Sequence, residues 1–188
     1  LEQKRMAWLQ KPDKLQALRD RIASASTPAE RVEATMALAE VIWPRDPVTV
    51  RPLLEQVVAE ADAAGRPSDR GRAAYMLGEL LRRAGDLDGA ARYAETVFKV
   101  ADATGDRRIR ARGFNLVGTM HEERGEHQSA LECFEEYLEI SRQVGHWQGE
   151  RSALNQLACV HAHRGDLGKA LECYRQCLEA NTKARDAH

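Results

Sequence analysis

Residues 110–145 read RARGFNLVGTMHEERGEHQSALECFEEYLEISRQVG, and residues 150–185 read ERSALNQLACVHAHRGDLGKALECYRQCLEANTKAR. At an offset of 40 residues, Asn115 matches Asn155, Arg124-Gly125 matches Arg164-Gly165, and the letters Ala-Leu-Glu-Cys at 130–133 return at 170–173. A repeat of this length is typical of stacked units, each of which buries its apolar face against its neighbours. The chain is therefore predicted to be a repeat array.

Weaker copies of the unit precede these two. One step of 40 residues towards the N-terminus finds Gly78 at the position of Gly118 and Gly85 at that of Gly125. A further step finds only scattered matches. We predict four units, a degenerate one at residues 27–66 and regular ones at 67–106, 107–146 and 147–188. Residues 1–26 contain one more amphipathic helix, which is predicted to cap the first unit.

Helix signals fill every unit, so the predicted fold class is all-α. Thr27-Pro28 is typical of a helix start, and Pro44 is expected to end that helix at Trp43. The turn within each regular unit carries a glycine, suited to the left-handed conformation that ends a helix, and then an acid expected to cap the next helix. These pairs are Gly85-Asp86, Gly125-Glu126 and Gly165-Asp166. Small residues are expected where paired helices approach most closely, at Gly78, Gly118, Ala158, Ala90, Ala130 and Ala170.

The units resemble tetratricopeptide repeats, in the longer form found in kinesin light chains and in bacterial signalling and regulatory proteins. The residues that carry the resemblance are Phe114, Val117-Gly118, Ala130 and Phe134 in one unit, and Leu154, Leu157-Ala158, Ala170 and Tyr174 in the next. His121 and His161 stand where the family has its first aromatic residue, and Ala94 replaces the second one in residues 67–106. The resemblance covers about residues 28–185 and implies a right-handed α-solenoid of antiparallel helix pairs.

Composition excludes several classes of function. The 188 residues are 30% charged with a formal net charge of -1, which gives no reason to expect a nucleic-acid partner. No apolar run is long enough to span a membrane, and the first residues lack the apolar core of a signal peptide. A cytoplasmic location is expected, with the four cysteines reduced. Because the chain begins at Leu1, we interpret it as a fragment of a larger protein.

The family resemblance also implies where a ligand would bind, because the first helix of each unit lines a concave groove. The positions that match the family's ligand positions are Arg72, Tyr75, Glu79, Arg82, Arg83, Arg112, Asn115, Thr119, Glu122, Glu123, Ser152, Asn155, Cys159 and His163.

Asn115 and Asn155 are the most specific members of this set. A side-chain amide is both a donor and an acceptor, so a row of amides can bind the backbone of an extended peptide whatever its side chains. The alternative is that the two asparagines have no binding role and are simply polar residues suited to a solvated groove. We expect partner charge to be selected by four arginines together with two acids: Arg72, Arg82, Arg83, Arg112, Glu122 and Glu123. The alternative is that the arginines are solvent-exposed surface residues with no binding role.

A metal site is the weaker interpretation of the histidines and cysteines. Cys159 and His163 lie one helical turn apart, as do Cys173 and Cys177, which is compatible with zinc in principle. The two pairs are expected to face different sides of the unit, so we predict neither a metal nor any other cofactor. No nucleophile motif or phosphate loop is present, and we expect no enzyme activity.

The predicted function is a module that binds a protein or an extended peptide in its groove. A second class stays open, in which the segment is a sensor, regulatory or dimerisation part of a larger bacterial signalling protein or transcription factor. The last helix has apolar residues Leu171, Tyr174 and Leu178 with no capping helix after them, so we expect either that the chain continues beyond His188 or that this helix pairs with a second copy. A scaffold without a single ligand is the third class.

Overall fold

The computed structural model of the protein describes residues 12–43 and 45–186, which form nine helices and no strand. Residues 1–11 of the predicted cap, Pro44 and residues 187–188 lie outside the described part. The helices are α2 (Pro12–Ala23), α3 (Pro28–Ile42), α4 (Pro47–Glu60), α5 (Pro67–Arg83), α6 (Leu87–Thr104), α7 (Arg107–Glu123), α8 (His127–Gln143), α9 (Trp147–His163) and α10 (Leu167–Asp186).

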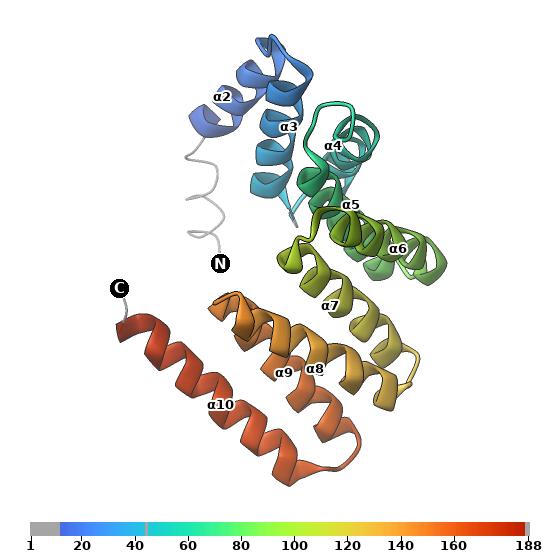
Figure 1. Ribbon diagram of the computed structural model, residues 1–188, viewed down its shortest axis with the longest axis vertical. Helices are drawn as coiled ribbons and strands as arrows, with labels where there is room; N and C mark the ends of the chain where they lie inside the picture. The colour runs from blue at the N-terminus through green and yellow to red at the C-terminus, as the bar shows by residue number, and fades with distance from the viewer. Residues whose placement is uncertain (1–11, 44, 187–188) are drawn as a thin grey trace.

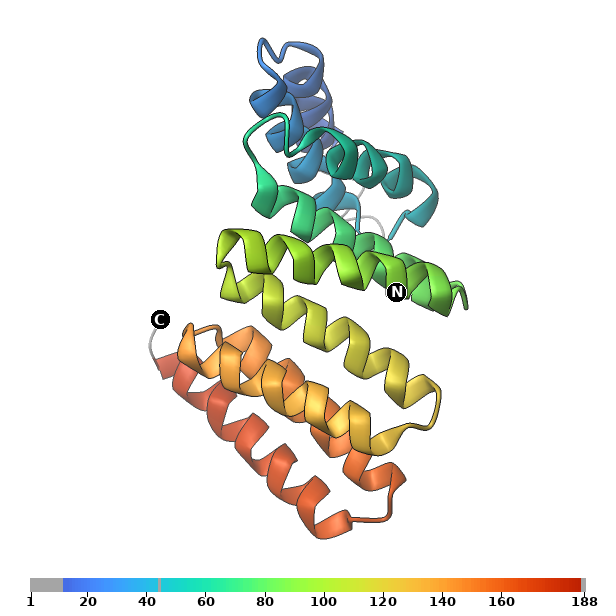
Figure 2. The ribbon, with the colours of Figure 1, turned by 45° about the vertical axis from the view of Figure 1, so that its right-hand side comes forward.

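The helices form a right-handed α-solenoid of antiparallel pairs, as the resemblance implied. Each helix packs against the next one along the chain, and the pairs stack as successive layers from α2 to α10 (Figures 1 and 2). The first helices of neighbouring pairs also touch, α3 with α5, α5 with α7 and α7 with α9. These first helices therefore form the inner face of the curved array.

Glycine ends the helices in the turns. Gly85 has φ +84°, and the amide of Asp86 donates to the carbonyl of Leu81 at 2.9 Å, which closes the end of α5 in the left-handed manner. Asp86 then caps α6, because its Oδ1 accepts from the amide of Gly89 at 2.7 Å. The same expectation is wrong for Glu126, whose side chain makes no capping hydrogen bond. It lies instead 2.5 Å from Nδ1 of His121.

This difference predicts unequal effects of two otherwise similar substitutions. Asp86→Ala should lower the free energy of unfolding by about 1 kcal/mol, because it leaves the first amides of α6 without their acceptor. Glu126→Ala should cost less, since no cap is lost. Urea denaturation followed by circular dichroism measures both, and a larger loss for Glu126→Ala would contradict this assignment.

Close helix contacts depend on the small residues picked out in the sequence. A Cβ atom on Gly118 would lie 2.7 Å from Cε1 of Phe134, so α7 and α8 can meet here only at glycine. Phe134 is fully buried, and Ala130 beside it is buried as well. The core is thus a succession of clusters between neighbouring helices, which is the packing of a repeat array.

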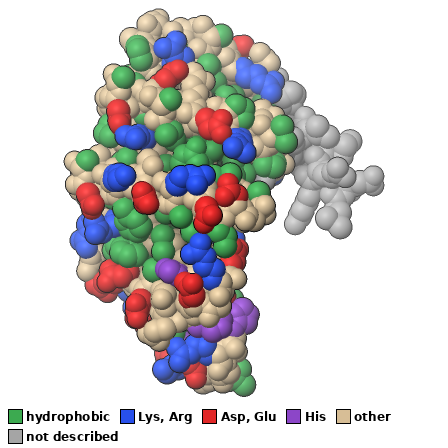
Figure 3. All heavy atoms as spheres, turned by 90° about the vertical axis from the view of Figure 1, so that its right-hand side faces the viewer, with side chains coloured by type: hydrophobic (Ala, Val, Ile, Leu, Met, Phe, Trp, Pro, Cys, Tyr) green, Lys and Arg blue, Asp and Glu red, His purple; other side chains and the backbone are tan. Residues whose placement is uncertain are grey.

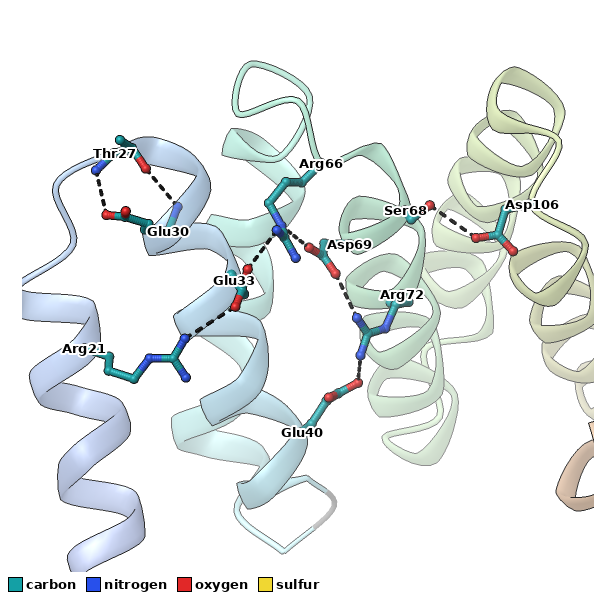
Figure 4. A network of polar contacts seen from close by, with 10 residues as sticks. All are labelled: Arg21, Thr27, Glu30, Glu33, Glu40, Arg66, Ser68, Asp69, Arg72 and Asp106. Carbon is teal, nitrogen blue, oxygen red and sulfur yellow. Dashed lines mark hydrogen bonds and ion pairs between the residues drawn. The ribbon is translucent and has the colours of Figure 1, made fainter.

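A chain of charged contacts ties the N-terminal helices together (Figure 4). Asp69, only 4% exposed, lies between Arg66 at 2.5 Å and Arg72 at 2.8 Å. Those two arginines reach back to α3, Arg66 to Glu33 at 2.9 Å and Arg72 to Glu40. Arg21 of α2 meets Glu33 as well, at 3.4 Å, so α2 is joined to α3 by charge as well as by packing.

The outer side of the array carries intermingled charges. Figure 3 shows acidic and basic side chains interspersed on the face that lies at the right of Figure 1. Within the described residues, no helix is long and apolar enough to cross a membrane.

Candidate functional site

Three side chains occupy the same repeat position on the inner face: Tyr75 in α5, Asn115 in α7 and Asn155 in α9. The amide of Asn115 is 3.1 Å from the hydroxyl of Tyr75, with Nδ2 as the donor. Its Oδ1 is buried and has no hydrogen-bond partner among the described residues. Whichever way the amide is turned, one polar end meets Tyr75 and the other is left buried and unpaired. Asn155 is exposed and offers both ends of its amide to solvent.

A cavity of about 260 Å³ opens beside this row, which we call the α5–α7–α9 cavity. Its lining comes from α5, α7, α8 and the first turn of α9, and consists of Tyr75, Arg108, Ala111, Arg112, Asn115, Tyr137, His146, Gln148 and Gly149. The cavity brings together three residues predicted from the sequence, Tyr75, Arg112 and Asn115.

The electrostatic character of the cavity is positive. The guanidinium of Arg112 lies over the Tyr75 ring, 5.3 Å from its centroid, which is cation–π geometry. Burial, with the charge of Glu79, raises the pKa of Tyr75 to about 12, so its hydroxyl stays protonated. Burial lowers the pKa of His146, and the charges of Arg108 and Arg112 lower it further. At neutral pH the positive charge of the lining therefore comes from the two arginines.

Two of the arginines predicted to select partner charge are already neutralised within the protein. Arg82 is 3.0 Å from Glu79, which is only 6% exposed, and it also pairs with Glu123. Arg72 is held by Asp69 and Glu40. Carboxylates that hold these guanidinium groups leave them little capacity for a partner's charge.

Arg83 is exposed, lies over the Trp43 ring at 5.4 Å and is 3.7 Å from Glu79. Arg112, which forms no ion pair with a described residue, is the predicted arginine with an unsatisfied charge at the cavity. Of the four predicted arginines, only Arg112 lines the cavity.

The other predicted ligand positions form contacts within the protein, some with one another and some with residues that were not predicted. Glu122 is 3.2 Å from Nδ1 of His163, and the hydroxyl of Thr119 donates to the carbonyl of Asn115 at 2.8 Å. Ser152 hydrogen-bonds Tyr137, and the thiol of Cys159 is 3.8 Å from the hydroxyl of Tyr174. These contacts stiffen the inner face around the cavity.

The cysteines do not converge on a metal site. Cys159 approaches Tyr174, whereas Cys177 is 3.8 Å from the carbonyl of Arg151. All four thiols are free, and in the described part of the chain no group of three or more histidine, cysteine or acidic residues is placed to hold a metal ion.

Six cavity residues were not among the predicted ligand positions: Arg108, Ala111, Tyr137, His146, Gln148 and Gly149. Two of them could have been recognised from the sequence. Arg108 precedes Arg112 by one helical turn, and His146 stands at the repeat position of the capping residue Asp106. Tyr137 lies on α8, the second helix of its unit, and nothing in its sequence context distinguishes it from a core residue.

A family model matches the sequence of the chain, and solved structures match its fold. The sequence model of the tetratricopeptide repeat family matches residues 69–143 and 109–183. No curated protein matches. The apo form of RapI is similar in structure, with a TM-score of 0.78 and 14% identity over 98% of this chain and 68% of that one. BtubC (BKLC) from P. vanneervenii gives a TM-score of 0.72 with 14% identity over 99% of this chain and 78% of its own.

A putative kinesin light chain from Podospora anserina, with nearly identical repeats, has a TM-score of 0.65 and 18% identity, covering 98% of this chain and 94% of its own. At these identities the structural likeness defines the fold alone. The matched sequence, by contrast, spans most of the described helices, from α5 to α10. The chain belongs to the tetratricopeptide repeat family.

Proposed function

We propose that this array is a protein-binding module that holds an extended peptide on its inner face, across α5, α7 and α9. Arrays of this family generally serve protein interaction, and this chain has a matching place for a ligand. The observation that carries the proposal is the α5–α7–α9 cavity, which is lined by Tyr75 and Asn115, two members of the row that Asn155 continues on α9. A concave, partly apolar cavity with a few convergent polar groups is the usual form of a ligand site.

The amides supply the backbone contacts. Asn155 is exposed, and its donor and acceptor can bind one peptide unit at once. Asn115 has one polar end buried without a partner, and an unpaired buried group of this kind costs about 1–3 kcal/mol. A peptide recovers part of that cost only if the Asn115 side chain turns so that the peptide can reach this atom. The packing of the inner face holds both helices in place before binding, so little ordering is needed on the module's side.

The experiment that tests this function is selection from a library of random short peptides displayed on phage, with the array immobilised. We expect peptides that bind the wild type, and we expect the Asn115→Ala, Asn155→Ala double variant to bind them at least tenfold more weakly, because the hydrogen bonds of both amides are lost. Fluorescence anisotropy of the labelled peptides measures the affinities. Gln128→Ala, on α8, is the matched control and should bind as the wild type does.

Circular dichroism must show that each variant is folded. Equal binding by the double variant and the wild type would place the site away from the two asparagines. If no peptide is selected, peptide binding by this array is refuted.

One surface favours the second function, a dimerisation or regulatory segment. Four side chains of α10 are exposed although they are large and apolar: Leu167 (65%), Leu171 (69%), Tyr174 (39%) and Leu178 (67%). The residues at the same repeat position as Leu171 and Tyr174 are Leu131 and Phe134, which α9 helps to bury. The face of α10 therefore has the form of a surface that a further helix would cover. Sedimentation equilibrium over a range of concentrations separates the two functions, since only dimerisation raises the mass.

A further inference from the structure

Several arginines of the array have acidic partners. Arg110 of α7 is 2.5 Å from Asp102, and Arg142 of α8 is 2.9 Å from Glu150. Arg82 is held by Glu79 and Glu123. Arg108 and Arg112 differ, because neither forms an ion pair with any described residue, and both line the α5–α7–α9 cavity. They are four residues apart on α7, so their side chains lie one above the other on the same helix face.

The lining adds no negative charge to balance the two arginines. It contains no aspartate or glutamate. Glu79, whose charge contributes to the raised pKa of Tyr75, is itself bound by Arg82 at 3.0 Å. Arg112 is half-buried, whereas Arg108 is exposed to solvent. Two guanidinium groups without an acidic partner form a specific receptor for an oxyanion, because each presents a planar fork of donors.

The beginning of α9 strengthens this field. In the preceding unit Asp106 caps α7, with its Oδ1 accepting from the amides of Arg108 at 2.9 Å and Ile109 at 3.2 Å. The residue at the same repeat position before α9 is His146, whose side chain makes no capping hydrogen bond. The N-cap position of α9 therefore lacks a carboxylate, and the one acidic residue of its first turn, Glu150, is paired with Arg142 at 2.9 Å. The lowered pKa of His146 also reflects the charges of Arg108 and Arg112, which reach this end of the cavity.

We infer that the α5–α7–α9 cavity binds the carboxylate of an aspartate or glutamate side chain of the bound peptide, through Arg108 and Arg112. The inference rests on the proposed function and names the peptide chemistry that the site selects. A volume of about 260 Å³ exceeds what a carboxylate needs, so the aliphatic part of the acidic side chain fits beside the rings of Tyr75 and Tyr137. Asn115 forms part of the wall of the same cavity.

The test uses the same displayed library and compares three forms of the array. These are the wild type, the Arg108→Gln, Arg112→Gln double variant, and an Arg110→Gln, Arg142→Gln control that loses the same charge from paired arginines. We expect wild-type selections to be enriched in aspartate or glutamate at one peptide position. Replacing that acid by glutamine in the best peptide should weaken binding to the wild type by tenfold or more, a loss typical of charge-assisted hydrogen bonds.

The double variant should bind the acidic peptide and its glutamine form equally, whereas the control should keep the wild-type preference. Selected peptides without acidic enrichment, or a preference that survives in the double variant, would overturn the carboxylate assignment and leave the peptide-binding function standing. Failure to select any peptide would refute both. A third synthetic peptide carries phosphoserine in place of the acid. If it binds more tightly than the acidic form through the same two arginines, the carboxylate assignment is overturned and the site is assigned to phosphate instead.

Discussion

Replacing Phe134 with alanine is expected to lower the free energy of unfolding by about 3–5 kcal/mol, the range found for a buried aromatic residue. Phe134 has no exposed surface, and its ring fills the space where α7 and α8 approach at Gly118. Glycine cannot fill the resulting hole, so the substitution adds a cavity to the loss of buried apolar surface. Urea denaturation followed by circular dichroism measures the loss.

The repeat provides a matched control for this substitution. Tyr174 occupies the same repeat position in α10 but is 39% exposed. Tyr174→Ala should therefore cost much less than Phe134→Ala, because the wild-type ring is only partly removed from water. Equal losses would show that an aromatic residue at this repeat position contributes the same free energy of unfolding whether or not it is buried.

Replacing Arg82 with methionine should cost about 3 kcal/mol, because it leaves the carboxylate of Glu79 buried without its main partner. Glu79 is 6% exposed, and Arg82 holds it at 3.0 Å. Burial alone would lower the pKa of Arg82, but the hydrogen bond and charge of Glu79 outweigh it and the pKa is raised. The measurement is again the free energy of unfolding in urea.

Two further variants isolate the cause. The Glu79→Leu, Arg82→Met double variant should recover most of the loss, since an apolar pair of similar volume often replaces a buried ion pair without cost. Arg83→Met should change stability by less than about 1 kcal/mol, because Arg83 is exposed and 3.7 Å from Glu79. A double variant as unstable as Arg82→Met would indicate that packing by the arginine, rather than the stranded charge, accounts for the effect.

The architecture was predictable because its signals are local and recur. Glycines with positive φ occur at Gly65, Gly85, Gly105, Gly125, Gly145 and Gly165, so the helix ends return at a constant interval. The small residue at Gly118 marked a close helix contact, since only glycine admits the ring of Phe134 there. Such features depend on one residue and its near neighbours in the chain, and the amino-acid letters display them directly.

The site was only partly predictable, because it depends on which distant side chains meet. The pairing of Arg82 with Glu123 joins residues 41 apart in the chain, and no local pattern distinguishes a paired arginine from a free one. The bond between Asn115 and Tyr75 likewise depends on the positions of two helices. His146 is different, since it stands at the repeat position of Asp106 and the amino-acid letters alone therefore indicate the missing cap.

The contacts of the array also determine how the protein opens. Along the chain each helix packs mainly against the helices of its own and adjacent units, and α10 packs against α9. In such an array a break at one end need not disturb the other, so opening is graded along the array instead of all-or-none. A peptide held across α5, α7 and α9 would fasten the middle units to one another. The terminal helices would keep their own freedom to open, so protection from amide exchange on binding would be concentrated at the centre.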